Sequence, residues 1–167
     1  MPLGLVLGLK MVTSDEVRGH TAIHVIKGAV VHVLGRGAKW SASAYSQGIH
    51  GGLTVKFDRK PTDEELTRIE EAANHKIMED ATTEVLEMSR SDAEARWGDD
   101  IYDLFPLPAE LKVVKIFHLP DWNVNTCGKQ HCSKTGELGG LKIVKWRYRS
   151  NKRLLEISFD VTGINVS

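Results

Sequence analysis

The first strong hydrophobic pattern along the chain has the period of an α-helix. Between residues 19 and 34, apolar side chains recur three or four positions apart, and Gly35 follows at the position where a helix commonly stops. The pattern therefore predicts a helix over residues 19–34. His20, His24 and Lys27 fall together on a stripe beside the apolar one.

Alternation with a period of two predicts the strands. Residues 39–57 have the pattern of strand, turn and strand, because a glycine-rich turn is followed by apolar residues at every second position up to Phe57. Further strands are expected at residues 83–88 and 111–119, and a hairpin is expected at residues 142–149 and 154–159.

Two capping boxes predict where further helices begin. Thr62 with Glu65 precedes an apolar stripe, and Ser91 with Glu94 predicts a short helix over residues 92–98. Helices and strands are mixed without a regular β-α-β alternation. We therefore expect an α+β fold in which helices pack on one face of a largely antiparallel sheet.

Composition narrows the range of functions. The 167 residues predict one domain, with residues 1–11 as an N-terminal extension or edge strand. Lys plus Arg and Asp plus Glu number 22 each, so any contact with nucleic acid has to come from a local patch. Two cysteines favour a reducing, cytoplasmic setting over a disulfide scaffold, and no apolar run reaches the length of a membrane span.

Two residue pairs have the spacing of metal ligands. His20 and His24 lie four positions apart on the predicted helix, and Cys127 and His131 have the same spacing in a polar segment far along the chain. Imidazole and thiolate together favour Zn²⁺. Histidines in a core or on a surface are the alternative. Cys132 is interpreted as a bystander thiol.

The segments around these pairs resemble a known family. Cys-Gly-x-x-His at residues 127–131 is followed by Thr-Gly-Glu-x-Gly at 135–139, and His-Thr-Ala-x-His stands upstream at 20–24. This combination is similar to the editing domain of alanyl-tRNA synthetases. With DLFP at 103–106 and DWNVN at 121–125, it resembles AlaX, the free-standing trans-editing family in its short archaeal form.

The resemblance implies an editing-domain fold of the threonyl/alanyl-tRNA synthetase type and a cytoplasmic enzyme. It implies zinc-assisted hydrolysis of mischarged tRNA(Ala), in which the wrong amino acid is chiefly serine and sometimes glycine. The zinc ligands would be His20, His24, Cys127 and His131. Ser41 falls where short forms commonly have threonine, and its hydroxyl would contact the seryl side chain. Asn125 replaces an acidic residue that related domains tend to have there.

Four protein ligands are typical of a closed structural zinc site, whereas catalytic zinc usually keeps a position open. There are three ways in which such a site could act on a substrate. In the first, one ligand is loosely held, with His131 as the candidate. In the second, the ion expands its coordination. The third possibility is that zinc anchors the substrate while water held elsewhere attacks.

Two sequence features are candidates for contact with tRNA. The hairpin carries a strip of cations, and these are Lys145, Arg147, Arg149, Lys152 and Arg153. Lys39 and Trp40 could neutralise and stack on the tRNA 3′ end. A solvated edge strand protected by charge and a tryptophan in the core are the respective structural alternatives.

Two other functions use the same features. One is a metallohydrolase that acts on small esters, and the other is a zinc-stabilised tRNA-binding module without catalysis. A domain of this length does not need a metal in order to fold, which favours a functional role for zinc. Both a monomer and a weak dimer are compatible with the sequence.

Overall fold

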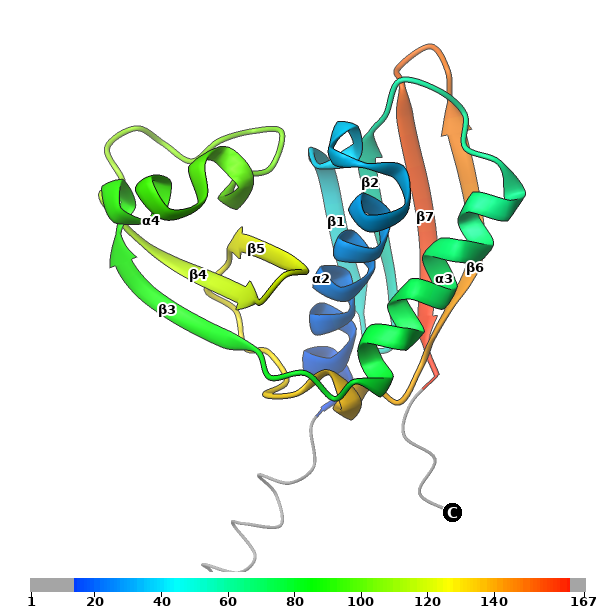
Figure 1. Ribbon diagram of the computed structural model, residues 1–167, viewed down its shortest axis with the longest axis horizontal. Coiled ribbons are helices and arrows are strands. Elements are labelled where there is room, and N and C mark those ends of the chain that lie inside the picture. The colour runs from blue at the N-terminus through cyan, green and yellow to red at the C-terminus, as the bar shows by residue number, and fades with distance from the viewer. Residues whose placement is uncertain (1–13, 163–167) are drawn as a thin grey trace, which may run out of the picture.

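The computed structural model describes residues 14–162, which form two antiparallel sheets and the helices packed against them (Figure 1). The expected extension at residues 1–11 lies outside this range. The helices are α2 (Asp15–Leu34), α3 (Asp63–Met78) and α4 (Arg90–Trp97), with 3₁₀ turns η1 (Arg36–Ala38), η2 (Gly98–Ile101) and η3 (Thr135–Leu138). The strands are β1 (Ser41–Gln47), β2 (His50–Lys56), β3 (Glu84–Ser89), β4 (Val113–Leu119), β5 (Asn123–Thr126), β6 (Leu141–Arg149) and β7 (Leu154–Val161).

The predicted α+β class with antiparallel pairing is confirmed, but the strands divide between two sheets. One has the order β1-β2-β7-β6 and the other β3-β4-β5. Helix α2 lies between them, packed on β1 and β2 and touching β5 on its other side (Figure 1). Because both sides of this helix are covered, nearly every residue from Arg18 to Val30 is buried, well beyond the width of the apolar stripe.

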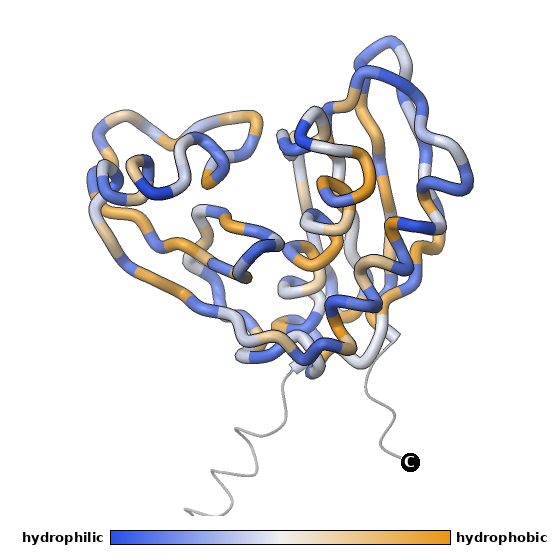
Figure 2. The backbone as a smooth tube through the Cα atoms, in the orientation of Figure 1, coloured by the Kyte–Doolittle hydropathy of each residue, from blue (hydrophilic) through white to orange (hydrophobic). Residues whose placement is uncertain are grey.

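The core lies between the four-stranded sheet and helices α2 and α3. Alternate residues of β7 face this core, and these are Leu155, Ile157, Phe159 and Val161. Hydrophobic positions gather along α2 and the central strands, while the connections are mostly hydrophilic (Figure 2). Gly28 allows Trp122 to pack directly against α2, because a Cβ there would collide with the Trp122 ring.

The helix starts agree with the sequence in one case and differ in two. The predicted capping box of Thr62 and Glu65 is present at α3. Helix α2 begins earlier than predicted, since the hydroxyl of Ser14 accepts a hydrogen bond from the Val17 amide. The capping box assigned to Ser91 is wrong: Ser89, extended at the end of β3, accepts the Asp92 amide instead. Within residues 14–162, no helix has the length and apolarity needed to cross a membrane.

Candidate metal centre and its cleft

The two predicted ligand pairs meet at one point. His20 and His24 project from α2, while Cys127 follows β5 and His131 lies in the next loop. Their ligand atoms all lie within 4.8 Å of one another. Nε2 of His20 is 3.1 Å from Sγ of Cys127, and Nε2 of His131 is 3.2 Å from Nε2 of His24.

Two side chains of α2 hold the backbone of the segment that carries the second pair and of the turn that follows it. Thr21 Oγ1 donates to the Val17 carbonyl, so it can accept from the Cys132 amide at 2.9 Å. The buried guanidinium of Arg18 donates to the carbonyls of Glu137 and Leu138 at 3.1 Å each. The threonine of the His-Thr-Ala-x-His motif therefore fixes the loop to the helix at Cys132, the residue next to His131.

The donor set fits a tetrahedral divalent metal. Ligand bond lengths of about 2.0–2.3 Å place donor atoms roughly 3.3–3.8 Å apart. The two close pairs, at 3.1 and 3.2 Å, are slightly nearer than this, and all four donor atoms lie within 4.8 Å. Nδ1 of His24 lies 2.8 Å from the amide oxygen of Asn123. Since that oxygen only accepts, the proton resides on Nδ1, and Nε2 keeps its lone pair for an ion. Phe117 stacks on the same ring with centroids 4.0 Å apart.

The protonation states of the histidines also fit a metal centre. Burial lowers the pKa of His24 well below its usual range, with His131 adding to the effect. Burial likewise lowers the pKa of His131 to about 4, helped by His20. Three neutral imidazoles therefore share a small volume at neutral pH, and neutral nitrogen is the form that binds metal. Burial raises the pKa of the Cys127 thiol, and a bound cation would oppose that shift.

The centre opens onto a cleft of about 450 Å³ between β1, α2 and the loops after η2 and β5. Among the four ligands, His20, His24 and Cys127 line the cleft. Ser41 lies buried in the same wall, where its Oγ accepts a hydrogen bond from the Lys27 ammonium at 2.5 Å. Burial lowers the pKa of Lys27 to about 8.

Asp103 is open to solvent through this cleft but is surrounded by protein on its other sides. That burial raises the pKa of its carboxyl, while Lys27 and a hydrogen bond from Asn125 oppose the shift. The cleft therefore combines the metal-type group with an ammonium, a hydroxyl and a carboxylate, which suits a small polar substrate.

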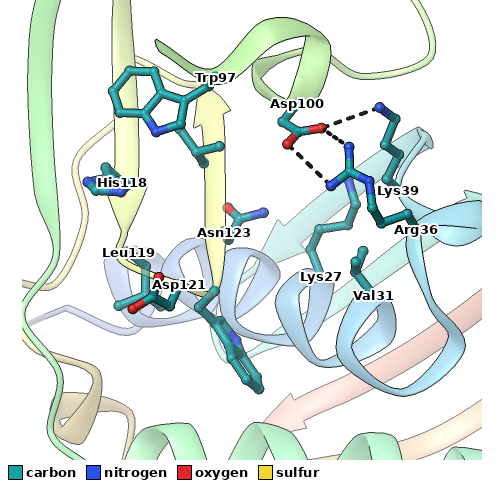
Figure 3. Close-up of a pocket in the computed structure, with 12 residues that line it drawn as sticks. Lys27, Val31, Arg36, Lys39, Trp97, Asp100, His118, Leu119, Asp121 and Asn123 are labelled. Atoms are coloured by element: carbon teal, nitrogen blue, oxygen red, sulfur yellow. Dashed lines mark hydrogen bonds and ion pairs between the residues drawn. The ribbon is translucent and has the colours of Figure 1, made fainter.

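A second cleft of about 370 Å³ shares Lys27 with the first (Figure 3). Asp100 spans its mouth by accepting from Arg36 at 2.6 Å and from Lys39 at 3.3 Å. Lys39 thus lines this second cleft and is already ion-paired. Trp40 packs against the cluster of apolar residues around Ile101 and Tyr102. This packing agrees with the structural alternative to stacking on tRNA, in which Trp40 is a core residue.

The cationic hairpin is on the opposite edge of the four-stranded sheet from β1. Lys145, Arg147 and Arg149 lie on β6, and Lys152 and Arg153 in the turn that follows. Arg147 and Arg149 both pair with Glu156, at 3.4 and 2.6 Å. This strip and the metal centre therefore lie on different parts of the molecule.

Sequence reasoning gave no role to several residues of the site, including Lys27 and Asn123. Lys27 was placed on the same helix stripe as His20 and His24 but was given no role. Its position three residues after His24 was the sequence feature that could have indicated a place in the site. Asn123 orients His24, and its sequence context gives no sign of that, because the contact depends on how β5 lies against α2.

Sequence comparison gives relatives for most of the chain. No family model matches. Alanine–tRNA ligase of Methanopyrus kandleri is 41% identical over 128 residues, or 76% of this chain. The same enzyme of Pyrococcus abyssi is 34% identical over 131 residues, and that of Sulfurisphaera tokodaii is 36% identical over 126. The match spans only 14% of the length of each relative.

The fold and the His/His/Cys/His group define an antiparallel α+β domain with a candidate metal centre in a polar cleft. The segment shared with the ligases is their editing domain. The chain is therefore an AlaX-like editing domain, homologous to that of alanine–tRNA ligases.

Proposed function

We propose that this protein is a trans-editing hydrolase that acts in the cytoplasm and removes chiefly serine, and in part glycine, from mischarged tRNA(Ala). One observation carries the proposal: three of the four metal-type ligands line a cleft whose wall also holds the Lys27–Ser41 pair. Homology to the editing domain of alanine–tRNA ligases supports the class of substrate.

His20, His24, Cys127 and His131 would hold zinc, which supplies a Lewis acid for the ester carbonyl or for water. Asn123 and Phe117 keep the His24 ring fixed, so the ligand geometry is prepared before substrate binds. The ester approaches through the cleft, from the side formed by His20, His24 and Cys127. Asp103, in the same cleft wall, is close enough to Lys27 for their charges to interact.

Lys27 determines which hydrogen bond Ser41 offers. Because the ammonium only donates, Ser41 Oγ accepts from it, and the Ser41 proton remains available for a ligand. A seryl hydroxyl can accept that proton. An alanyl group leaves the buried donor unpaired, which is the arrangement that gives strong discrimination against an analogue lacking a hydroxyl. Serine in place of the family's usual threonine leaves room for one more methyl group at this position.

The proposal is tested by release of serine from seryl-tRNA(Ala), with zinc-loaded protein, with metal-stripped protein and with His24→Ala. We expect hydrolysis only by the loaded wild type. A separate assay with serine methyl ester distinguishes the small-ester hydrolase, which would act on both substrates equally. Binding of tRNA without any release of serine would contradict the proposal and leave a zinc-stabilised tRNA-binding module.

A further inference from the structure

We propose that Phe105 and Lys129, at the mouth of the metal-centre cleft, form the binding site for the 3′-terminal nucleotide of the tRNA. The base stacks on the Phe105 ring, and the adjoining phosphate lies at the Lys129 ammonium. This inference rests on the proposed function, because it concerns how the same cleft holds the RNA end of its substrate.

Covalent connection limits where that nucleotide can be. The amino acid is joined by its ester directly to the terminal ribose, so an ester that reaches the metal centre leaves the terminal nucleotide just outside. The groups at that place are the cleft residues that are open to solvent. Phe105 and Lys129 are two of the exposed residues that line the cleft, and they come from the loops after η2 and β5. Tyr45 of β1 is also exposed there, but its ring packs over Gly52 and its hydroxyl lies 3.4 Å from Nε2 of His50.

Phe105 has the exposure expected of a stacking platform. Its side chain is 73% exposed, whereas the other three phenylalanines, Phe57, Phe117 and Phe159, are buried. The loop that carries it is anchored beside the site, since the Leu104 amide donates to the carbonyl of Ser41 at 2.8 Å. Pro106 follows and restricts the backbone. An exposed aromatic ring on an anchored loop suits base stacking, which is tolerant of base identity.

Lys129 supplies the matching charge. It lines the same cleft as His20 and Cys127, two residues after Cys127 in the chain. Within residues 14–162, Lys129 makes no ion pair, in contrast to Arg147 and Arg149 of the hairpin and to Lys39. An exposed cation beside the cleft therefore remains available for a phosphate.

The test measures the affinity of zinc-loaded protein for two uncharged acceptor-stem RNAs of tRNA(Ala), one complete and one lacking the 3′-terminal nucleotide. Wild type should bind the complete RNA about fivefold or more tightly. Phe105→Ala should lose this preference, and Phe105→Tyr should keep it. Met78→Ala is the matched control, because Met78 is 81% exposed but lies at the end of α3, away from the cleft.

Salt dependence tests the second residue. Lys129→Ala should reduce the slope of log affinity against log salt by about one for the complete RNA. The same variant should leave the slope for the shortened RNA unchanged. Lys152→Ala is the control, and it should change the slopes for the two RNAs equally or change neither. A Phe105→Ala variant that weakens both RNAs equally, or neither, overturns the nucleotide site. If the wild type releases serine but shows no preference for the complete RNA, the nucleotide site alone is overturned. If it prefers the complete RNA but does not hydrolyse the ester, the site is supported and the hydrolase is contradicted.

Discussion

Replacing Lys27 by methionine is expected to stabilise the protein at neutral pH while damaging its site. Lys27 is 5% exposed, and burial lowers its pKa from 10.5 to about 8. A shift of that size corresponds to about 3 kcal/mol of unfolding free energy that the charged side chain costs at pH 7. Loss of the hydrogen bond to Ser41 offsets part of this, by about 1–2 kcal/mol. We therefore expect Lys27→Met to be more stable by about 1–2 kcal/mol.

The pH dependence provides the sharper test. Between the folded pKa of about 8 and the unfolded value of 10.5, the unfolded chain binds more protons at Lys27, so wild-type stability from this group rises with pH. The methionine variant lacks this pH-dependent contribution to the free energy of unfolding. Its advantage should shrink by about 2 kcal/mol between pH 7 and pH 9.5.

Urea denaturation of the wild type and the variant at both pH values measures this change. Lys152→Met, an exposed lysine in the β6–β7 turn, serves as the control with no such change expected. An advantage of Lys27→Met that stays constant across this range, or a variant less stable than the wild type at pH 7, would mean that the buried charge of Lys27 does not destabilise the fold.

Three further predictions concern neighbouring residues. Gly28→Ala should destabilise the fold by about 1–3 kcal/mol in thermal unfolding, because a Cβ would meet the Trp122 ring at 2.3 Å. Asn123→Ala should weaken zinc affinity about 10- to 100-fold in chelator competition, since His24 loses the partner of its Nδ1 proton. Thr62→Ala should cost about 1 kcal/mol in urea unfolding through loss of the α3 cap. Unchanged values would contradict each assignment.

Local features of this fold were predictable because they depend on neighbouring residues. The capping box of Thr62 and Glu65 acts over three positions, and it is present as predicted. Ser89 and Ser91 are both possible caps, and the choice between them depends on where β3 ends. The division into two sheets was not predictable in this way, since a period of two does not specify which strands pair.

The candidate site shows the same limit. Spacing predicted one metal site built from two distant pairs, His20 with His24 and Cys127 with His131, and the structure brings both pairs together. Lys27 differs, because its low pKa arises from burial between α2 and the strands of both sheets, which no local pattern encodes. Charge density likewise favoured the hairpin as an RNA surface, although Glu156 pairs with two of its arginines.

The most direct test of the account is the ratio of deacylation rates for seryl-tRNA(Ala) and alanyl-tRNA(Ala), measured side by side with zinc-loaded protein. A buried hydroxyl donor that only serine can pair predicts a ratio of at least about 10² in favour of serine, reduced sharply in Ser41→Ala. Ser150→Ala, in the exposed turn between β6 and β7 and outside the cleft, should leave the ratio unchanged. Equal rates for the two substrates, or no hydrolysis of either, would contradict the account.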